Sequence, residues 1–306
     1  MSGRSRCVVV PVVAALAALV AAAPAWAHPR TATVAIDYRV TLHTVPGIDA
    51  SILDGDRSLR MRAHGRVVVL GDLNEPMLRF DHGVFVNLSS PTAQADRIVK
   101  KPSHGWRRVA RGSTYAWHEH RLSPPPFQSG RYGVVAQWSV PVVVDGRHGS
   151  VGGSFVRVAR PRWWLWLAIP VAIVAAAAAW LVRGRRGGAW TAIVAFLAAA
   201  AAAVVCQTAL LLRDSPTGRL SWIGLGVGIA VAVAACGLVV AARGITRIYT
   251  AGGLGAGIAA WTLSWWGVFF HGAVIAALPG DVVRACCALA LAGGLVAVAG
   301  SLTVHE

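Results

Sequence analysis

The run Trp117-His118-Glu119-His120-Arg121 carries two histidines on either side of a glutamate. If this run is a β-strand, its side chains alternate, so His118 and His120 share one face and Glu119 lies on the other. Their Cα atoms would then lie about 6.5–7 Å apart, so both rings could reach one metal ion, and imidazole suits Cu²⁺, Zn²⁺ or Ni²⁺. The run therefore predicts either a metal site, with Glu119 as a weaker ligand, or histidines that only form hydrogen bonds at a sheet edge.

A further histidine becomes a candidate ligand if the start of the chain is an export signal. A charged start and an apolar stretch over residues 8–23 lead to an A-x-A cleavage pattern that ends at Ala27. Cleavage there would leave His28 with a terminal amine, and amine plus imidazole make a strong chelate for Cu²⁺. We therefore predict a signal peptide over residues 1–27, with an uncleaved signal anchor as the alternative. The predicted metal ligands are His28, His118 and His120.

The composition of the chain predicts a membrane protein. Of its 306 residues 56% are hydrophobic, and the mean hydropathy is +0.57. The net charge of +16 comes mainly from scattered arginines without a long basic run, so we expect no nucleic-acid partner. The sequence has no G-x-S-x-G, P-loop, H-E-x-x-H or Cys-x-x-Cys motif, and we expect a protein that is not an enzyme.

Residues 28–160 are predicted to form an exported β domain. They contain eight of the ten histidines and no cysteine, so the domain must be stable without disulfides. Short β-branched and aromatic runs alternate with turn signals at 45–47, 81–83 and 145–146. Seven to nine such strands indicate an all-β, immunoglobulin-like sandwich, with a barrel as the alternative. Within it, Glu75 and Arg79 are predicted to form an ion pair or part of a recognition surface.

Residues 161–306 are predicted to form a transmembrane helical domain. Three tryptophans over 163–166 mark a membrane interface, and the apolar segments that follow are long enough to cross a bilayer. Arginines in the loops at 183–186 and 243–247 favour the cytoplasmic side, which places the β domain outside and the C-terminus inside. The five expected spans are 163–182, 189–212, 221–242, 250–272 and 282–301.

The expected spans offer little chemistry. No charged residue lies deep within them, which argues against an ion or proton pathway, and transport of a small solute is the weakest hypothesis. Cys286-Cys287 is interpreted as apolar packing in preference to a soft-metal site, since adjacent helical residues point about 100° apart. Two small-residue spacings predict close helix packing, namely Gly224-x-x-x-Gly228 and Gly253-x-x-x-Gly257.

Three segments of the exported half resemble a known protein family. VVVLGDLNEPMLRFDHGVFVNLSSPTA, WRRVARGSTYAWHEHR and W-x-V-P-V-x-V-D-G-R together are similar to a family of uncharacterised actinobacterial proteins. The resemblance implies a signal peptide, one exported β domain and several C-terminal spans, but no activity. Many members continue the WHEHR equivalent to a further His-Trp, which this chain lacks. The layout also loosely resembles fusions of periplasmic copper-binding domains to copper-transport membrane domains.

The sequence thus predicts a multi-pass cell-membrane protein with its β domain on the extracytoplasmic side. The first hypothesis is a binding protein for Cu²⁺ or another divalent metal, acting in homeostasis or delivery. The second is a non-catalytic module that interacts with an unknown protein of the cell envelope. In both, the lipid bilayer is a partner of the helical domain.

Overall fold

The computed structural model divides into two compact units. The β-rich unit contains Asp37–Ala159, and the helical unit contains Arg160–Leu212 and Arg219–Glu306 together with residues 34–36. The boundary near residue 160 agrees with the change in hydropathy along the sequence. The structure describes residues 34–53, 58–123, 132–183, 188–212 and 219–303.

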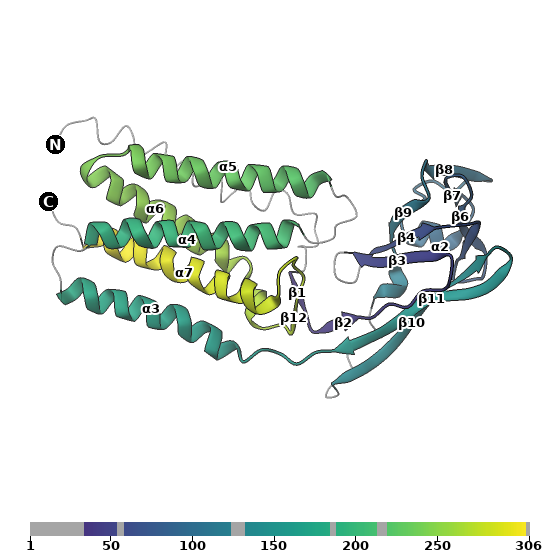
Figure 1. The fold of residues 1–306 in the computed structure, drawn as a ribbon, viewed down its shortest axis with the longest axis horizontal. Coiled ribbons are helices and arrows are strands. Elements are labelled where there is room, and N and C mark those ends of the chain that lie inside the picture. Colours follow the sequence, from purple (N-terminus) through teal and green to yellow (C-terminus); the bar gives the residue numbers. More distant parts are fainter. Residues whose placement is uncertain (1–33, 54–57, 124–131, 184–187, 213–218, 304–306) are drawn as a thin grey trace. The chain divides into compact units, whose positions relative to one another are not determined.

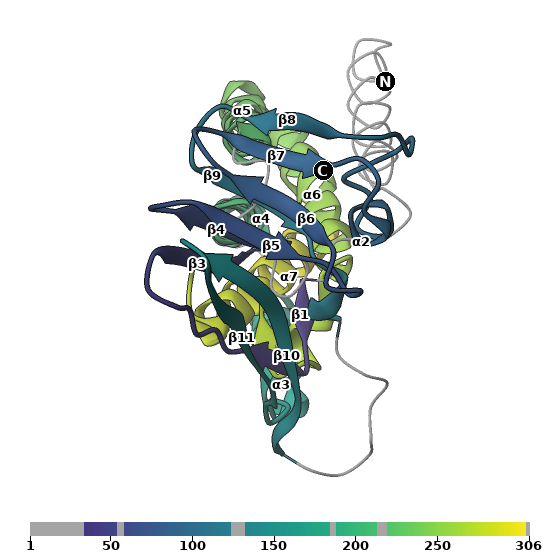
Figure 2. The same ribbon diagram turned by 90° about the vertical axis from the view of Figure 1, so that its right-hand side faces the viewer.

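The β-rich unit contains two antiparallel sheets (Figures 1 and 2). The smaller sheet has the order β3 (Ile48–Leu53), β4 (Ser58–Ala63) and β9 (Thr114–His118). The larger sheet has seven strands, in the order β2 (Tyr38–Val40), β11 (Arg147–Arg157), β10 (Gly133–Val144), β5 (Val67–Leu70), β6 (Pro76–Phe80), β7 (Val84–Asn87) and β8 (Trp106–Ala110).

Alternation of apolar and polar residues explains why these segments form half-buried strands. In β5 and β7 every second residue is buried, which is the period of a pleated strand with one face on a core. The core is made of aliphatic, methionine and aromatic side chains from both sheets, among them Leu59, Met61, Val67, Val69, Met77 and Phe80. The described cysteines all lie in the helical unit. The described part of the β-rich unit is therefore held together by packing, without disulfides.

The predicted turn at Asp145-Gly146 is confirmed. Both residues have positive φ angles, 46° and 83°, as a two-residue hairpin turn requires. The turn pairs Val144 with Arg147 and connects β10 to β11. A sandwich-like β region is therefore confirmed, although it has more strands than expected. The sheets do not by themselves establish an immunoglobulin-like arrangement.

A short helix interrupts the β-rich unit and was not predicted. Helix α2 (Pro91–Ala95) begins after Ser90, whose hydroxyl accepts a hydrogen bond from the amide of Ala93. A serine cap followed by proline at the first helical position is a helix-start signal, so the sequence did contain the information. The helix ends at Asp96, which is important for the site described below.

Three helices of the helical unit are long and apolar enough to cross a membrane, namely α3 (Trp163–Arg183), α4 (Gly188–Leu211) and α7 (Gly280–Leu302). This supports membrane association, and it confirms three of the five predicted spans by length and composition. The prediction of a span over 250–272 has the wrong bounds, because the helix there ends at Leu263 and is followed by a 3-10 helix and a short strand. The elements are α3 (Trp163–Arg183), α4 (Gly188–Leu211), α5 (Arg219–Ala241), α6 (Gly244–Leu263), η2 (Trp266–Phe269), and α7 (Gly280–Leu302), with β12 (Ala273–Val274) paired to β1 (Ala35–Ile36).

Glycines allow close helix packing, in part at a predicted position. A Cβ on Gly228 of α5 would lie 3.4 Å from Cγ of Gln207 on α4, which is an ordinary contact distance, and the surroundings of Gly224 lie outside what the structure describes. Gly253 is exposed, whereas Gly255 on α6 faces Gly294 on α7. A methyl group on Gly294 would lie 2.5 Å from the carbonyl oxygen of Gly255, so the two backbones nearly touch. Small residues permit this approach, and dispersion contacts between the helices are the result.

Candidate functional site

The WHEHR run does not form the continuous strand that the metal hypothesis assumed. Strand β9 ends at His118, and a 3-10 helix, η1 (His120–Leu122), begins after Glu119. The prediction that His118 and His120 share one strand face is therefore wrong. His118 is exposed at the strand end, while Glu119 is fully buried. The local cause is the Glu119 side chain, which accepts a hydrogen bond from the amide of Arg121 and caps the 3-10 turn.

Glu119 is held in the interior by an arginine and a tryptophan. Arg121 donates to both carboxylate oxygens, from Nε at 2.6 Å and from Nη2 at 2.9 Å. The indole of Trp117 donates to Oε2 at 3.0 Å. With the amide of Arg121, these bonds use the lone pairs of a carboxylate almost completely. A buried charge requires such compensation, because its desolvation would otherwise cost several kcal/mol.

His120 lies between two aspartates that are distant in sequence. Its Nδ1 lies 2.6 Å from Oδ1 of Asp96, and its Nε2 lies 2.8 Å from Oδ2 of Asp72. The backbone amide of His120 also donates to Asp96 at 3.0 Å. Asp96 is inaccessible to solvent and His120 is about one-third exposed, so the cluster is open on one side only. An imidazolium can donate to both carboxylates at once, which favours the protonated ring.

The surroundings shift the pKa values of His120 and Asp96. Burial lowers the pKa of His120, but the hydrogen bond to Asp96 and the charges of Asp96, Asp72 and Glu119 outweigh it, and the net pKa is raised. Burial, together with repulsion from Glu119, raises the pKa of the Asp96 carboxyl against the opposing effect of His120. Both groups therefore hold a proton more strongly than they would in water.

Helix α2 and the loop before β6 position the aspartates. Oγ1 of Thr92 accepts from the amide of Asp72 at 2.8 Å, and Glu75 accepts from the Ser90 hydroxyl at 2.7 Å. Burial raises the pKa of Glu75, but the hydrogen bonds that its carboxylate accepts, chiefly from Ser90 and Thr92, outweigh burial and the net pKa is lowered. The predicted ion pair of Glu75 with Arg79 is wrong. Glu75 fixes the start of α2 instead.

Asp96, Glu119 and His120 form a group whose geometry suits a metal ion. One ligand atom from each lies within 4.8 Å of the others, and this is the one such group among the described residues. Oδ2 of Asp96 is buried and has no hydrogen-bond partner in the described part of the chain. A buried carboxylate oxygen without a donor is costly, so the site favours a cation there. Asp96 was missed from the sequence, because it lies 24 residues from His120.

The other predicted ligands do not join this group. His28 lies outside the described residues, and His118 is not a member of the cluster. Elsewhere, His64 forms an exposed ion pair with Asp49, with 2.7 Å between Nε2 and Oδ2. As metal ligands, His28 and His118 stay predictions, whereas His120 and Glu119 lie together.

No protein-family model, curated protein or solved structure matches this chain. The resemblance to an uncharacterised actinobacterial family therefore rests on the sequence segments alone. The candidate site has to be interpreted from its own geometry and charges.

Proposed function

We propose that this chain is a membrane-anchored extracytoplasmic protein that binds a divalent metal ion for homeostasis or delivery, with Cu²⁺ as the preferred ion. The observation that carries the proposal is that one ligand atom each from Asp96, Glu119 and His120 lies within 4.8 Å of the others. The second carboxylate oxygen of Asp96 is buried and has no hydrogen-bond partner among the described residues. Imidazole with carboxylate oxygens is a borderline ligand set, and Cu²⁺ binds such sets more tightly than Zn²⁺ does.

The metal would compete with protons at this site, because the pKa values of both His120 and Asp96 are raised. Nδ1 of His120 and the carboxylate of Asp96 then supply a nitrogen and an oxygen ligand, while Asp72 orients the ring through Nε2. Glu119 is the weaker ligand, because coordination would require it to give up a hydrogen bond from Arg121 or Trp117. His28 would add the terminal amine if the signal peptide is removed.

The bilayer is the proposed partner of the helical unit. We place five spans there, with the β-rich unit outside and the C-terminus in the cytoplasm, on the basis of the arginines near 183–186 and 243–247. We also propose that the chain belongs to the actinobacterial family and that the β-rich unit is an immunoglobulin-like sandwich. The arginines in the short loops support the orientation, and the three sequence segments described above support the family membership.

Titration calorimetry of the full chain in detergent tests the metal site directly. We expect one Cu²⁺ per chain, with binding weakened about 100-fold in His120→Gln and in Asp96→Asn. His64→Gln is the matched control, because it removes a histidine that is paired to an exposed aspartate outside the cluster. His28→Ala measures the contribution of the N-terminus. Equal binding in wild type, His120→Gln and Asp96→Asn would remove this cluster from the proposal.

The pH dependence of binding distinguishes His120 from an exposed histidine. Metal and proton compete for Nδ1, and the pKa of His120 is raised in the folded protein. Copper binding should therefore weaken as the pH falls, beginning above the ordinary histidine range near pH 6.5. An exposed histidine would lose the metal only at lower pH.

A separate observation favours the second hypothesis, an interaction module of the cell envelope. On strands β6 to β8 the guanidinium of Arg79 lies 5.0 Å from the ring centroids of both Phe85 and Trp106, and Arg108 lies 5.9 Å from Phe85. Trp106 is 37% exposed in the edge strand β8. Arginine and tryptophan are enriched in protein interfaces. If no metal binds at all, cross-linking from position 106 in cells should capture a specific partner, and Arg79→Ala should abolish it.

A further inference from the structure

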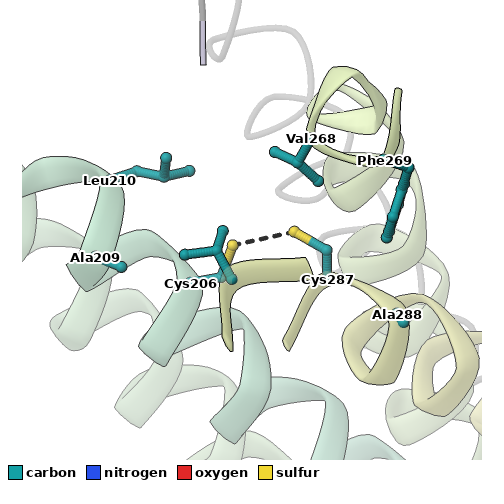
Figure 3. Packing of buried hydrophobic residues seen from close by; sticks show 8 residues of the cluster. Cys206, Ala209, Leu210, Val268, Phe269, Cys287 and Ala288 are labelled. Carbon is teal, nitrogen blue, oxygen red and sulfur yellow. Dashed lines mark hydrogen bonds between the residues drawn. The ribbon is translucent and has the colours of Figure 1, made fainter. Parts of the chain in front are cut away.

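Two cysteine side chains of the helical unit are in direct contact. Sγ of Cys206 on α4 lies 3.2 Å from Sγ of Cys287 on α7, and Figure 3 shows both side chains directed at each other. Each residue is about 1% exposed. The sequence directed attention to the adjacent pair Cys286-Cys287, whereas the structure pairs Cys287 with a residue 81 positions away.

We propose that Cys206 and Cys287 are a redox-active thiol pair that closes to a disulfide joining α4 and α7. A disulfide has an S–S bond of about 2.05 Å, so the two sulfur atoms need to approach by only about 1 Å. We expect side-chain rotation to bring the two sulfur atoms together.

The packing of the two helices keeps the sulfur atoms together. A methyl group on Gly293 of α7 would lie 2.8 Å from the carbonyl oxygen of Ala195 on α4, so the backbones are very close along this contact. Because a cysteine side chain is short, two cysteines can form a disulfide between helices only where the helix backbones lie this close together. The pair is therefore a product of the glycine contact between α4 and α7.

The surroundings of the pair favour a disulfide over a metal site. The neighbouring buried side chains are apolar and offer no further ligand (Figure 3), namely Ala209, Leu210, Val268, Phe269 and Ala288. Cys286 packs against this cluster, yet the three cysteines do not converge as a metal-binding group among the described residues. Two thiols alone do not complete the four-ligand shell of a structural zinc site.

The oxidation requires an apolar two-electron acceptor, and we assign this role to a membrane-soluble quinone. The two thiols lose two protons and two electrons and form one S–S bond, while the quinone takes up both and becomes a quinol. An apolar oxidant matches a pair enclosed by apolar side chains. In the orientation proposed above, the pair lies about 8–10 Å from the extracytoplasmic ends of α4 and α7, on the side of the membrane where disulfides persist.

Counting thiols in the full chain tests the proposal. Membranes that contain the protein are treated with a fully substituted short-chain benzoquinone, whose ring has no open position for thiol addition. They are then denatured and labelled with a maleimide polymer that adds a visible mass per thiol. We expect two labels fewer than in the reduced protein, and dithiothreitol should restore both. The disulfide closes a loop of about 80 residues, so the thermal midpoint in detergent should rise by on the order of 10 °C.

Variants and mass spectrometry identify the cysteines that react. Cys206→Ala and Cys287→Ala should lose no label on oxidation, whereas the matched controls Cys286→Ala and Cys236→Ala should still lose two. Because an alanine variant can fail to fold, the wild-type chain is also digested without reduction, and a cross-linked peptide pair containing positions 206 and 287 is expected. A loss of labels that persists in Cys206→Ala, or a cross-link between other cysteines, would overturn the proposal. So would full labelling after benzoquinone.

Discussion

At the scale of single residues, the candidate site is a network of opposed charges whose protons are tightly held. The raised pKa of His120 means that the folded protein binds this proton more strongly than the unfolded chain. The resulting stability is complete below about pH 6.5 and is lost as the pH rises through the folded pKa. Glu75 has the opposite sign, since its lowered pKa gives stability that is lost as the pH falls.

Glu119 is predicted to be the most sensitive residue of this network. Glu119→Gln leaves Arg121 without its buried countercharge, and we expect the β-rich unit to lose about 3 kcal/mol of unfolding free energy. Asp49→Asn removes an exposed pair and should cost less than about 1 kcal/mol. Pulse proteolysis of the full chain in increasing urea measures both. Equal losses in the two variants would contradict the buried ion pair.

At the scale of elements, side chains decided where the strand of the WHEHR run ends. The alternating pattern favours a strand through Arg121, but the carboxylate of Glu119 turns back to the Arg121 amide and a 3-10 turn follows. This competition between a side-chain hydrogen bond and a strand ladder is a general property of turn-forming residues. In the helical unit, single residues likewise decide the contacts between helices, because glycines allow the backbones to approach closely.

The contact between α6 and α7 should tolerate no added methyl group. Gly294→Ala would bring its methyl against the Gly255 carbonyl, and we expect a loss of about 1–3 kcal/mol of stability. Gly237 on α5 has open space around its Cα, so Gly237→Ala should be neutral or stabilising by up to about 1 kcal/mol. Thermal unfolding of the full chain in detergent compares them. A neutral Gly294→Ala would mean that the helices do not pack through this glycine.

At the scale of the whole molecule, each compact unit has its own core. The β-rich unit has large buried side chains of its own, and the partners of Glu119 and His120 also lie within this unit. Independent cores are what separate folding units require.

The segment 28–160 should therefore fold when it is produced alone. We expect a circular dichroism spectrum typical of β structure and a single cooperative unfolding transition without any disulfide. The variant Phe80→Ala, which empties a buried position between the strands, is the control and should lower the transition midpoint markedly. A spectrum dominated by helix, or no transition, would show that the β-rich unit depends on the helical one.

The sequence by itself determined the division of this protein into a β-rich and an apolar helical part. Hydropathy and strand alternation are local properties, so a window of about 20 residues is enough to read them. The same holds for the turn at Asp145-Gly146, where the residue types themselves favour positive φ angles. His120 and Glu119 were found for a related reason, since their spacing is visible within five residues.

Only the tertiary structure decided which residues meet. Asp96 and Asp72 reach His120 across 24 and 48 residues, and Cys287 reaches Cys206 across 81. No periodicity in one sequence encodes such pairings, because they depend on how sheets and helices pack after the chain has turned several times. The Asp96 oxygen that has no hydrogen-bond partner among the described residues and the contact between the two thiols are therefore properties of the fold. The sequence shows the residues but not these arrangements.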